Sequence, residues 1–190
     1  MTLRTARLTL ICHGSTRALR EAAFPGDEPL EPQALAKAAA LTPLLRRVDA
    51  AWSSPARRAL ETAAALGLAA ETEAALADID VGTWAGRSLA DVEASDPAGL
   101  ASWMSDAAAC PHGGETIVAL IRRVAGWLET LQGAEGRVFA VTHPAVIRAA
   151  VLIALDAPPV SFWRIDVEPL CFVRLQGRAG RWTLRSLGAR

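Results

Sequence analysis

Two strand-like segments of this chain each end directly at a histidine, and this feature constrains the fold most. Residues 7–12 (RLTLIC) precede His13, and residues 137–142 (RVFAVT) precede His143. Apolar runs of this length are typical of buried strands. Strands that alternate with helices form a mostly parallel sheet covered on both faces, and ligands bind beyond the carboxyl ends of its strands. We therefore predict a three-layer α/β/α sandwich that brings His13 and His143 to the same edge of the sheet.

The remaining elements follow from apolar periodicity and from breaks at Gly and Pro. Ser54 is the expected N-cap of a helix that begins at Pro55, and Thr116 the expected cap of a later one. The chain of 190 residues fits one domain, 1–190, with a lid-like helical insertion around 78–115. We expect helices over 33–47, 55–66, 89–104, 116–131 and 144–155, and further strands over 49–53, 71–75, 160–166, 170–175 and 182–186.

The charge balance restricts the classes of partner. Lys plus Arg (20) equals Asp plus Glu (20), so no overall field favours nucleic acid or an anionic membrane, and any anion site must be local. No segment approaches the roughly 18 to 20 uninterrupted apolar residues of a spanning helix, and the N-terminus lacks the apolar region of a signal peptide. Cys12, Cys110 and Cys171 are odd in number and irregularly spaced, which argues against a disulfide framework or a zinc site. We expect a cytoplasmic protein without a nucleic-acid or membrane partner.

Five short motifs, taken together in their order, carry a family resemblance. The segment 12–16 (CHGST) resembles R-H-G-x-T, 53–63 (SSPARRALETA) resembles S-S-P-x-x-R-A-x-x-T-A, 78–86 (DIDVGTWAG) resembles E-x-D-F-G-x-W-E-G, 113–116 (GGET) resembles G-G-E-S, and 141–143 (VTH) resembles V-S-H. The chain is similar in this way to the first branch of the histidine phosphatase superfamily, the phosphoglycerate-mutase-like proteins.

This resemblance implies a phosphoglycerate-mutase-like fold and a metal-independent phosphomonoester hydrolase. Such an enzyme would act on a small phosphorylated metabolite through a phosphohistidine intermediate, without a cofactor or a metal. We expect a small-molecule phosphate ester as the partner and a homodimer as a possible assembly.

The same resemblance assigns roles to residues, each with a structural alternative. His13 is the candidate nucleophile, or else a strand-end histidine held by the backbone. Arg58 is the candidate phosphate ligand, or else the partner of Glu61 in a surface ion pair. His143 is the candidate hydrogen-bond donor to a phosphoryl oxygen, or else a helix cap. Asp78 is the candidate general acid, or else a solvated loop carboxylate.

Further candidates surround these four. Asp80 or Glu115 could share the task of Asp78, and His112 is expected to be an exposed loop residue. Thr16, Arg17 and Arg20 are candidate phosphate-binding residues, and Gly114 and Glu115 candidate residues of a substrate loop.

Three positions depart from the family pattern. Cys12 replaces the Arg of R-H-G, Leu19 stands where many members have a phosphate-contacting Asn, and Asp78 is shorter than the usual Glu. Arg17 or Arg20 could restore the missing charge. The alternative function is a catalytically weak or inactive phosphatase-like protein that binds a phosphate ligand or a partner.

Other enzyme classes fit less well. A cysteine-based phosphatase needs the motif Cys-x5-Arg. Counted from Cys12, the arginine would stand at position 18, where this chain has Ala18. The three histidines lie far apart in sequence, without a paired acidic motif that would indicate a metal-dependent hydrolase. No Walker-type phosphate-binding motif is present.

Overall fold

A six-stranded mixed sheet forms the centre of the computed structural model, which describes residues 5–45, 47–132 and 136–188. The strands are β1 (Thr5–Cys12), β2 (Ala50–Ser53), β3 (Glu71–Thr72), β4 (Arg137–Thr142), β5 (Phe172–Arg178) and β6 (Arg181–Gly188). Their order is β3-β2-β4-β1-β5-β6. The first four in this order run parallel, β5 pairs antiparallel with β1, and β6 pairs antiparallel with β5. The prediction of a mostly parallel sheet is confirmed.

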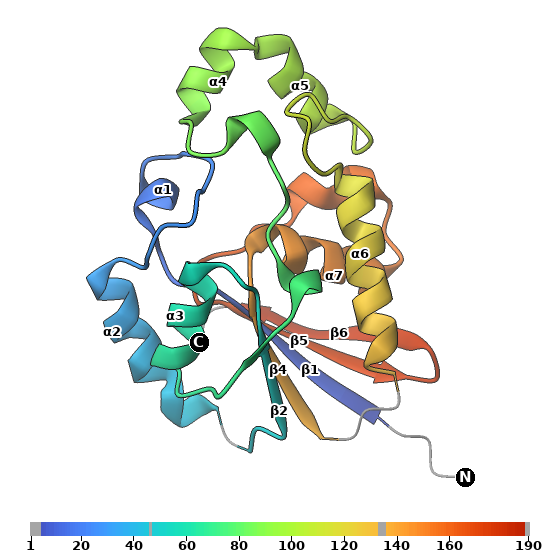
Figure 1. The fold of residues 1–190 in the computed structure, drawn as a ribbon. Coiled ribbons are helices and arrows are strands. Elements are labelled where there is room, and N and C mark those ends of the chain that lie inside the picture. The colour runs from blue at the N-terminus through green and yellow to red at the C-terminus, as the bar shows by residue number, and fades with distance from the viewer. Residues whose placement is uncertain (1–4, 46, 133–135, 189–190) are drawn as a thin grey trace.

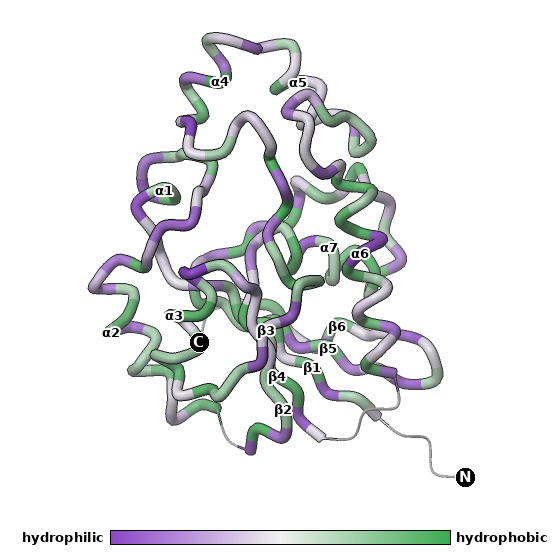
Figure 2. The backbone as a smooth tube through the Cα atoms, viewed as in Figure 1, coloured by the Kyte–Doolittle hydropathy of each residue, from purple (hydrophilic) through white to green (hydrophobic). Residues whose placement is uncertain are grey.

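Helices cover both faces of this sheet (Figure 1). One layer contains α2 (Pro32–Leu41) and α3 (Arg57–Ala65), and the other contains α6 (Ile117–Thr130) and α7 (Pro144–Leu155). The hydropathy tube is green along most of α7 (Figure 2), as expected for a helix with few exposed residues. The predicted three-layer α/β/α sandwich is therefore confirmed.

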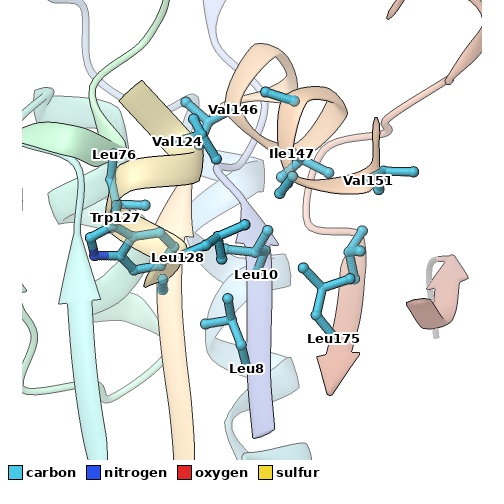
Figure 3. Close-up of a cluster of buried hydrophobic side chains, with 14 of the residues drawn as sticks. Leu8, Leu10, Leu76, Val124, Trp127, Leu128, Val146, Ile147, Val151 and Leu175 are labelled. Carbon is cyan, nitrogen blue, oxygen red and sulfur yellow. The ribbon is translucent and has the colours of Figure 1, made fainter. Parts of the chain in front are cut away.

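Side chains of β1 alternate between these two layers, as the pleat of a strand requires. Leu8, Leu10 and Cys12 belong to the core formed with α6 and α7, whereas Ile11 belongs to the core formed with α2 and α3. Figure 3 shows Leu8 and Leu10 beneath side chains of α6 and α7. The side chain at position 12 thus lies on the α7 side of the sheet, at the end where β1 meets His13.

A second, smaller core lies beyond the carboxyl ends of the strands. It contains Val81, Trp84, Val92, Leu100 and Trp103, and Phe24 and Trp163 pack against it. Its residues come from η3 (Gly82–Trp84), α4 (Leu89–Ser95), α5 (Pro97–Ser105) and the loop before η3. In Figure 1, α4 and α5 lie above the end of the sheet at which β1 and β4 finish.

Several sequence-based boundaries were wrong. The helix expected over 33–47 ends at Leu41 and is followed by a 3₁₀ helix, and the strand expected over 71–75 ends at Thr72. Proline explains two of the other three differences. The predicted strand 160–166 is the 3₁₀ helix η4 (Pro159–Arg164), because Pro159 cannot donate to a strand ladder and Pro is favoured at a helix start. The predicted helix 89–104 is divided by Pro97, with the Asp96 side chain accepting from the Gly99 N–H at 2.9 Å as the new N-cap. The helix expected from Pro55 begins at Arg57 without a side-chain cap.

The short elements are α1 (Arg17–Arg20), η1 (Thr42–Leu44) and η2 (Ala74–Leu76). Thr116 caps α6 as predicted, with its hydroxyl accepting from the Ala119 N–H. No helix in the described part of the chain is long and apolar enough to cross a membrane.

Candidate active site

His13 lies directly after β1, and its backbone N–H donates to the Thr142 carbonyl at 2.9 Å. Its Nδ1 lies 2.7 Å from the Gly14 carbonyl oxygen, which can only accept, so Nδ1 carries the proton. Burial lowers the pKa of His13 below its usual value, although the hydrogen bond to Gly14 partly offsets this. At neutral pH the imidazole is therefore uncharged, and Nε2 holds a free lone pair.

The glycine after His13 links this loop to α3. The Gly14 N–H donates to Thr62 Oγ1 at 3.0 Å, and the Thr62 hydroxyl donates to the Arg58 carbonyl at 2.7 Å. An added Cβ at Gly14 would lie 3.0 Å from the Ala34 side chain of α2. This close packing fixes His13 relative to α3, which carries Arg58.

Arg58 is almost fully buried, with 3% of its surface exposed. Its Nη1 donates to the Gly26 carbonyl at 2.7 Å, and its Nη2 to Asp78 Oδ2 at 2.8 Å. Its Nε has no hydrogen-bond partner within the described residues. Glu61, the alternative partner considered from sequence, instead binds the exposed Arg57 at 2.8 Å.

His143 is fully buried at the start of α7, and its ring centroid is 5.1 Å from that of His13. Burial lowers its pKa to about 3, so the ring is neutral at physiological pH. Its Nε2 lies 2.7 Å from Ser54 Oγ, and its Nδ1 lies 3.3 Å from Asp78 Oδ2, outside hydrogen-bonding geometry.

Ser54 and Asp78 together favour a ring proton on Nδ1 of His143. Ser54 Oγ accepts from the Ala56 N–H at 3.2 Å and can donate its own proton to Nε2 of His143. The ring proton then lies on Nδ1, the nitrogen nearer the Asp78 carboxylate. The opposite tautomer would turn a lone pair toward that carboxylate. Nδ1–H of His143 and Nε–H of Arg58 are therefore two buried donors without an acceptor, as expected of a site that receives an oxyanion.

Asp78 stands between these donors, with 20% of its side chain exposed. Burial alone would raise the pKa of this carboxyl, but the neighbouring His143, Arg58 and His13 outweigh it and lower the pKa below its usual value. Since His143 is uncharged at neutral pH, Arg58 is the cation that keeps Asp78 ionised. Without a ligand, the candidate acid is thus a carboxylate.

The other sequence-predicted residues do not all join this cluster. Thr16 is buried and lies with His13 and Asp78 in the lining of one pocket, and it also caps α1, with its Oγ1 accepting from the Leu19 N–H at 3.3 Å. Arg17 and Arg20 are mostly exposed and pair with Glu21 at 2.9 Å and Glu31 at 2.8 Å, respectively. Neither guanidinium lines the pocket beside His13.

Glu115 lies behind the site and supports it. Its carboxylate binds Arg123 through two contacts of 2.9 and 2.6 Å. Arg123 also donates to the carbonyls of Ala75 at 2.8 Å and Ala77 at 3.0 Å, so the pair holds the segment that leads to Asp78.

Gly114 supports the same segment through its backbone. A Cβ at Gly114 would lie 2.1 Å from the Asp80 carbonyl oxygen, and the Glu115 N–H donates to that carbonyl at 2.7 Å. Asp80 itself accepts from the Gly82 N–H at 2.8 Å, closing the loop in which it lies. These residues shape the loop of Asp78 and do not line the pocket beside His13.

His112 is buried, so the expectation of an exposed loop residue was wrong. Its ring packs edge-on against Trp84 and Trp103, with centroid distances of 5.0 and 5.8 Å, and its Nδ1 accepts from the Gly114 N–H at 3.1 Å. Its place in a glycine-rich loop suggested exposure, whereas the neighbouring tryptophans exclude solvent.

A pocket of about 170 Å³ opens beside His13 and Asp78. Its wall is mainly apolar and includes Phe24, Trp103 and Phe162. The sequence analysis missed this pocket. It also missed Arg148, which lines the pocket from α7. No cluster of three or more potential metal ligands occurs among the residues that the structure describes.

Comparison with known proteins identifies the family. The model of the histidine phosphatase superfamily (branch 1) matches residues 8–190. The chain belongs to this superfamily. The resemblance inferred from the five motifs is therefore confirmed.

Several relatives within the superfamily extend this result. A bifunctional protein of Mycobacterium tuberculosis is 30% identical to this chain over 173 residues, covering 85% of the chain. The chain spans only 48% of the length of that protein. It is 30% identical to a glucosyl-3-phosphoglycerate phosphatase of Mycolicibacterium vanbaalenii, covering 86% of this chain and 80% of that protein. A mycobacterial glucosyl-3-phosphoglycerate phosphatase, solved with VO3, superposes with a TM-score of 0.87 at 27% identity, covering 97% of this chain and 99% of the other.

Against this histidine phosphatase framework, position 12 is the clearest departure. Cys12 is 1% exposed, and burial raises the pKa of its thiol well above the usual value. A buried neutral thiol is a poor nucleophile, so the site geometry favours His13 over Cys12.

Proposed function

We propose that the protein is a metal-independent phosphomonoester hydrolase that acts on a small phosphorylated metabolite through a phosphohistidine on His13. The observation that carries this proposal is the neutral His13, with its Nε2 lone pair free, beside the unpartnered donors of Arg58 and His143. A nucleophile next to donors for the oxygens of a dianion is what phosphoryl transfer requires.

In the first step, Nε2 of His13 attacks phosphorus, forming a P–N bond while the bond from phosphorus to the alcohol oxygen breaks. Arg58 and the Nδ1–H of His143 bind the phosphoryl oxygens. Asp78 donates a proton to the departing alcohol. In the second step, Asp78 takes a proton from the attacking water, the P–N bond breaks, and inorganic phosphate leaves.

Asp78 must be protonated for the first step although its pKa is low in the free protein. A phosphoryl dianion bound by the Nε–H of Arg58 and the Nδ1–H of His143 would lie beside Asp78, whose carboxylate binds Nη2 of the same guanidinium. Its two negative charges then raise the pKa of the neighbouring carboxyl, because like charges disfavour ionisation. Substrate binding would thus prepare the acid, and an ester of higher charge would do so more strongly.

The pocket beside His13 would receive the ester, with the alcohol against its apolar wall. Its volume of about 170 Å³ suits a group of roughly one ring, since an apolar cavity of about 150 Å³ is known to hold benzene. We infer that Ile79, Val81 and Trp103 cover this alcohol, and that segment 78–115, to which they belong, acts as a lid over the site.

A second candidate function is that of a weak or inactive phosphate-binding protein. The contact of 2.8 Å between Asp78 and Arg58 favours it, because the carboxylate competes with an incoming anion for the same guanidinium. The buried His13 and His143 pair favours the enzyme.

Turnover of p-nitrophenyl phosphate by purified protein, with and without EDTA, separates the two functions. We expect hydrolysis that survives chelation and is lost in His13→Ala, whereas Arg164→Ala, an exposed arginine of η4, should retain it. Inhibition by EDTA, or full activity of His13→Ala, would contradict the proposal. A panel of phosphate esters with one-ring and larger alcohols would then test the inferred size of the pocket.

A further inference from the structure

The positive charge missing at position 12 has a candidate replacement on α7. The pleat of β1 turns Cys12 toward the layer of α6 and α7, where it packs in the same core as Ala145 and Ala149. Arg148 lies between these two alanines in sequence. An arginine at position 12 and the arginine at position 148 would therefore approach the His13 pocket from the same side of the sheet.

The helix geometry directs Arg148 toward the active site. It lies four residues after Pro144, so it is on the same face of α7 as the first residue of the helix, one turn further along. Long helical side chains point toward the N-terminus of their helix, and here that end begins at His143. Consistent with this direction, Arg148 lines the pocket together with His13 and Asp78.

Its surroundings hold the guanidinium in place yet leave it free to bind. The Nε of Arg148 donates to the Ile165 carbonyl at 2.8 Å, and Cζ lies 5.7 and 5.4 Å from the ring centroids of Phe162 and Trp163. Among the described residues, neither terminal Nη atom of Arg148 has a hydrogen-bond acceptor. A fixed cation with two unused donors is suited to an oxyanion.

The charges around Arg148 agree with this position. Burial lowers the pKa of its guanidinium, while Asp166 and Asp78 raise it. The effect of Asp78 agrees with a guanidinium that lies near the candidate acid. Arginine nonetheless remains protonated in proteins, so the positive charge is retained.

We propose that Arg148 is the second arginine of the anion site, binding the phosphoryl group of the substrate from α7 in place of the arginine that the family motif carries at position 12. This rests on the proposed phosphatase function. It also replaces the sequence-based expectation that Arg17 or Arg20 restores the charge, because their exposed side chains pair with Glu21 and Glu31 outside the pocket.

Orthovanadate and inorganic phosphate are the appropriate probes, because they carry phosphoryl-like oxygens and no alcohol. A charge-assisted hydrogen bond lost from an anion site corresponds to roughly a 10- to 100-fold weaker affinity. We expect that loss for Arg148→Gln, a smaller loss for Arg148→Lys, and none for the matched control Arg164→Gln. Thermal unfolding of each variant reports whether it is folded at the assay temperature.

A double variant tests whether positions 12 and 148 serve the same anion. In the wild-type background, Cys12→Arg should leave vanadate affinity unchanged or lower it, since a second guanidinium would be repelled by the first. In the Arg148→Gln background it should restore at least part of the lost affinity. Cys12→Met in the same background, which adds volume without charge, should restore nothing.

Unchanged vanadate and phosphate affinity in a folded Arg148→Gln would overturn this proposal. So would a loss confined to esters whose alcohol carries a carboxylate, because Arg148 would then bind the alcohol. These readouts measure binding, so they remain valid if the wild-type protein turns over no ester. That result would contradict the proposed function alone.

Discussion

Ser54→Ala tests how the tautomer of His143, the proposed hydrogen-bond donor to the phosphoryl group, is fixed. Ser54 Oγ lies 2.7 Å from Nε2 of His143, and both residues are fully buried. The substitution leaves Nε2 without a partner in a place that water does not reach. It also removes the group that holds the ring proton on Nδ1, the nitrogen proposed to bind the phosphoryl group.

The expected effect on activity follows from the contact with His143, whereas the bond from the Ala56 N–H is also lost and affects the start of α3. A buried polar atom left unsatisfied costs about 1 to 3 kcal/mol, and a loss of that size in transition-state binding lowers kcat/KM by roughly 5- to 150-fold. We expect the effect in both the hydrolysis of p-nitrophenyl phosphate and the affinity for vanadate, since His143 is proposed to contact the phosphoryl oxygens in both.

Ser53→Ala is the matched control. Ser53 is equally buried and adjacent, but its hydroxyl donates to the Ser54 carbonyl at 3.0 Å and does not contact His143. Ser53→Ala should cost stability while largely retaining kcat/KM. If both variants lose activity in proportion to their loss of Tm, Ser54 has only a structural role and the assignment of the His143 tautomer fails.

Two further predictions concern stability and the loop of Asp78. Folding lowers the pKa of His143 from 6.5 to about 3. Between these two pH values the unfolded state therefore binds more protons at this residue than the folded state does. The contribution of His143 to the free energy of unfolding should fall as the pH decreases, by up to about 1.4 kcal/mol per pH unit. Urea unfolding from pH 7 to 4 should show a shallower decline for His143→Gln, and identical slopes would refute the assignment. Arg123→Ala should lower kcat and Tm together, because Arg123 binds Glu115 and the carbonyls before Asp78. The exposed Arg122→Ala should change stability by no more than about 0.5 kcal/mol, and an equal effect of the two would contradict this role.

The layered fold was predictable because its signals are local and repeated. Residues 7–12 and 137–142 are buried strands that end at His13 and His143, and Pro144 begins α7 as expected. Local signals failed where proline changed the backbone, as at Pro97 and Pro159. They also failed for His112, whose burial depends on tryptophans far away in sequence.

The site was predictable in its motifs but less so in its long-range contacts. His13, Arg58, Asp78 and His143 lie together, as the motif order suggested. The interpretation of Ser54 as a helix cap missed its bond to His143, which depends on two strands meeting at one edge. The sequence analysis did not select Arg148, although its spacing of one turn from Pro144 was a usable signal.

The central claim is the covalent phosphohistidine on His13, and trapping this intermediate tests it most directly. Protein quenched in base during turnover of a labelled phosphate ester should carry the label on His13, and acid treatment should release it, as expected of a P–N bond. His13→Ala should carry none. Label on Cys12, or turnover by wild-type protein without label on His13 under single-turnover conditions, would contradict the mechanism.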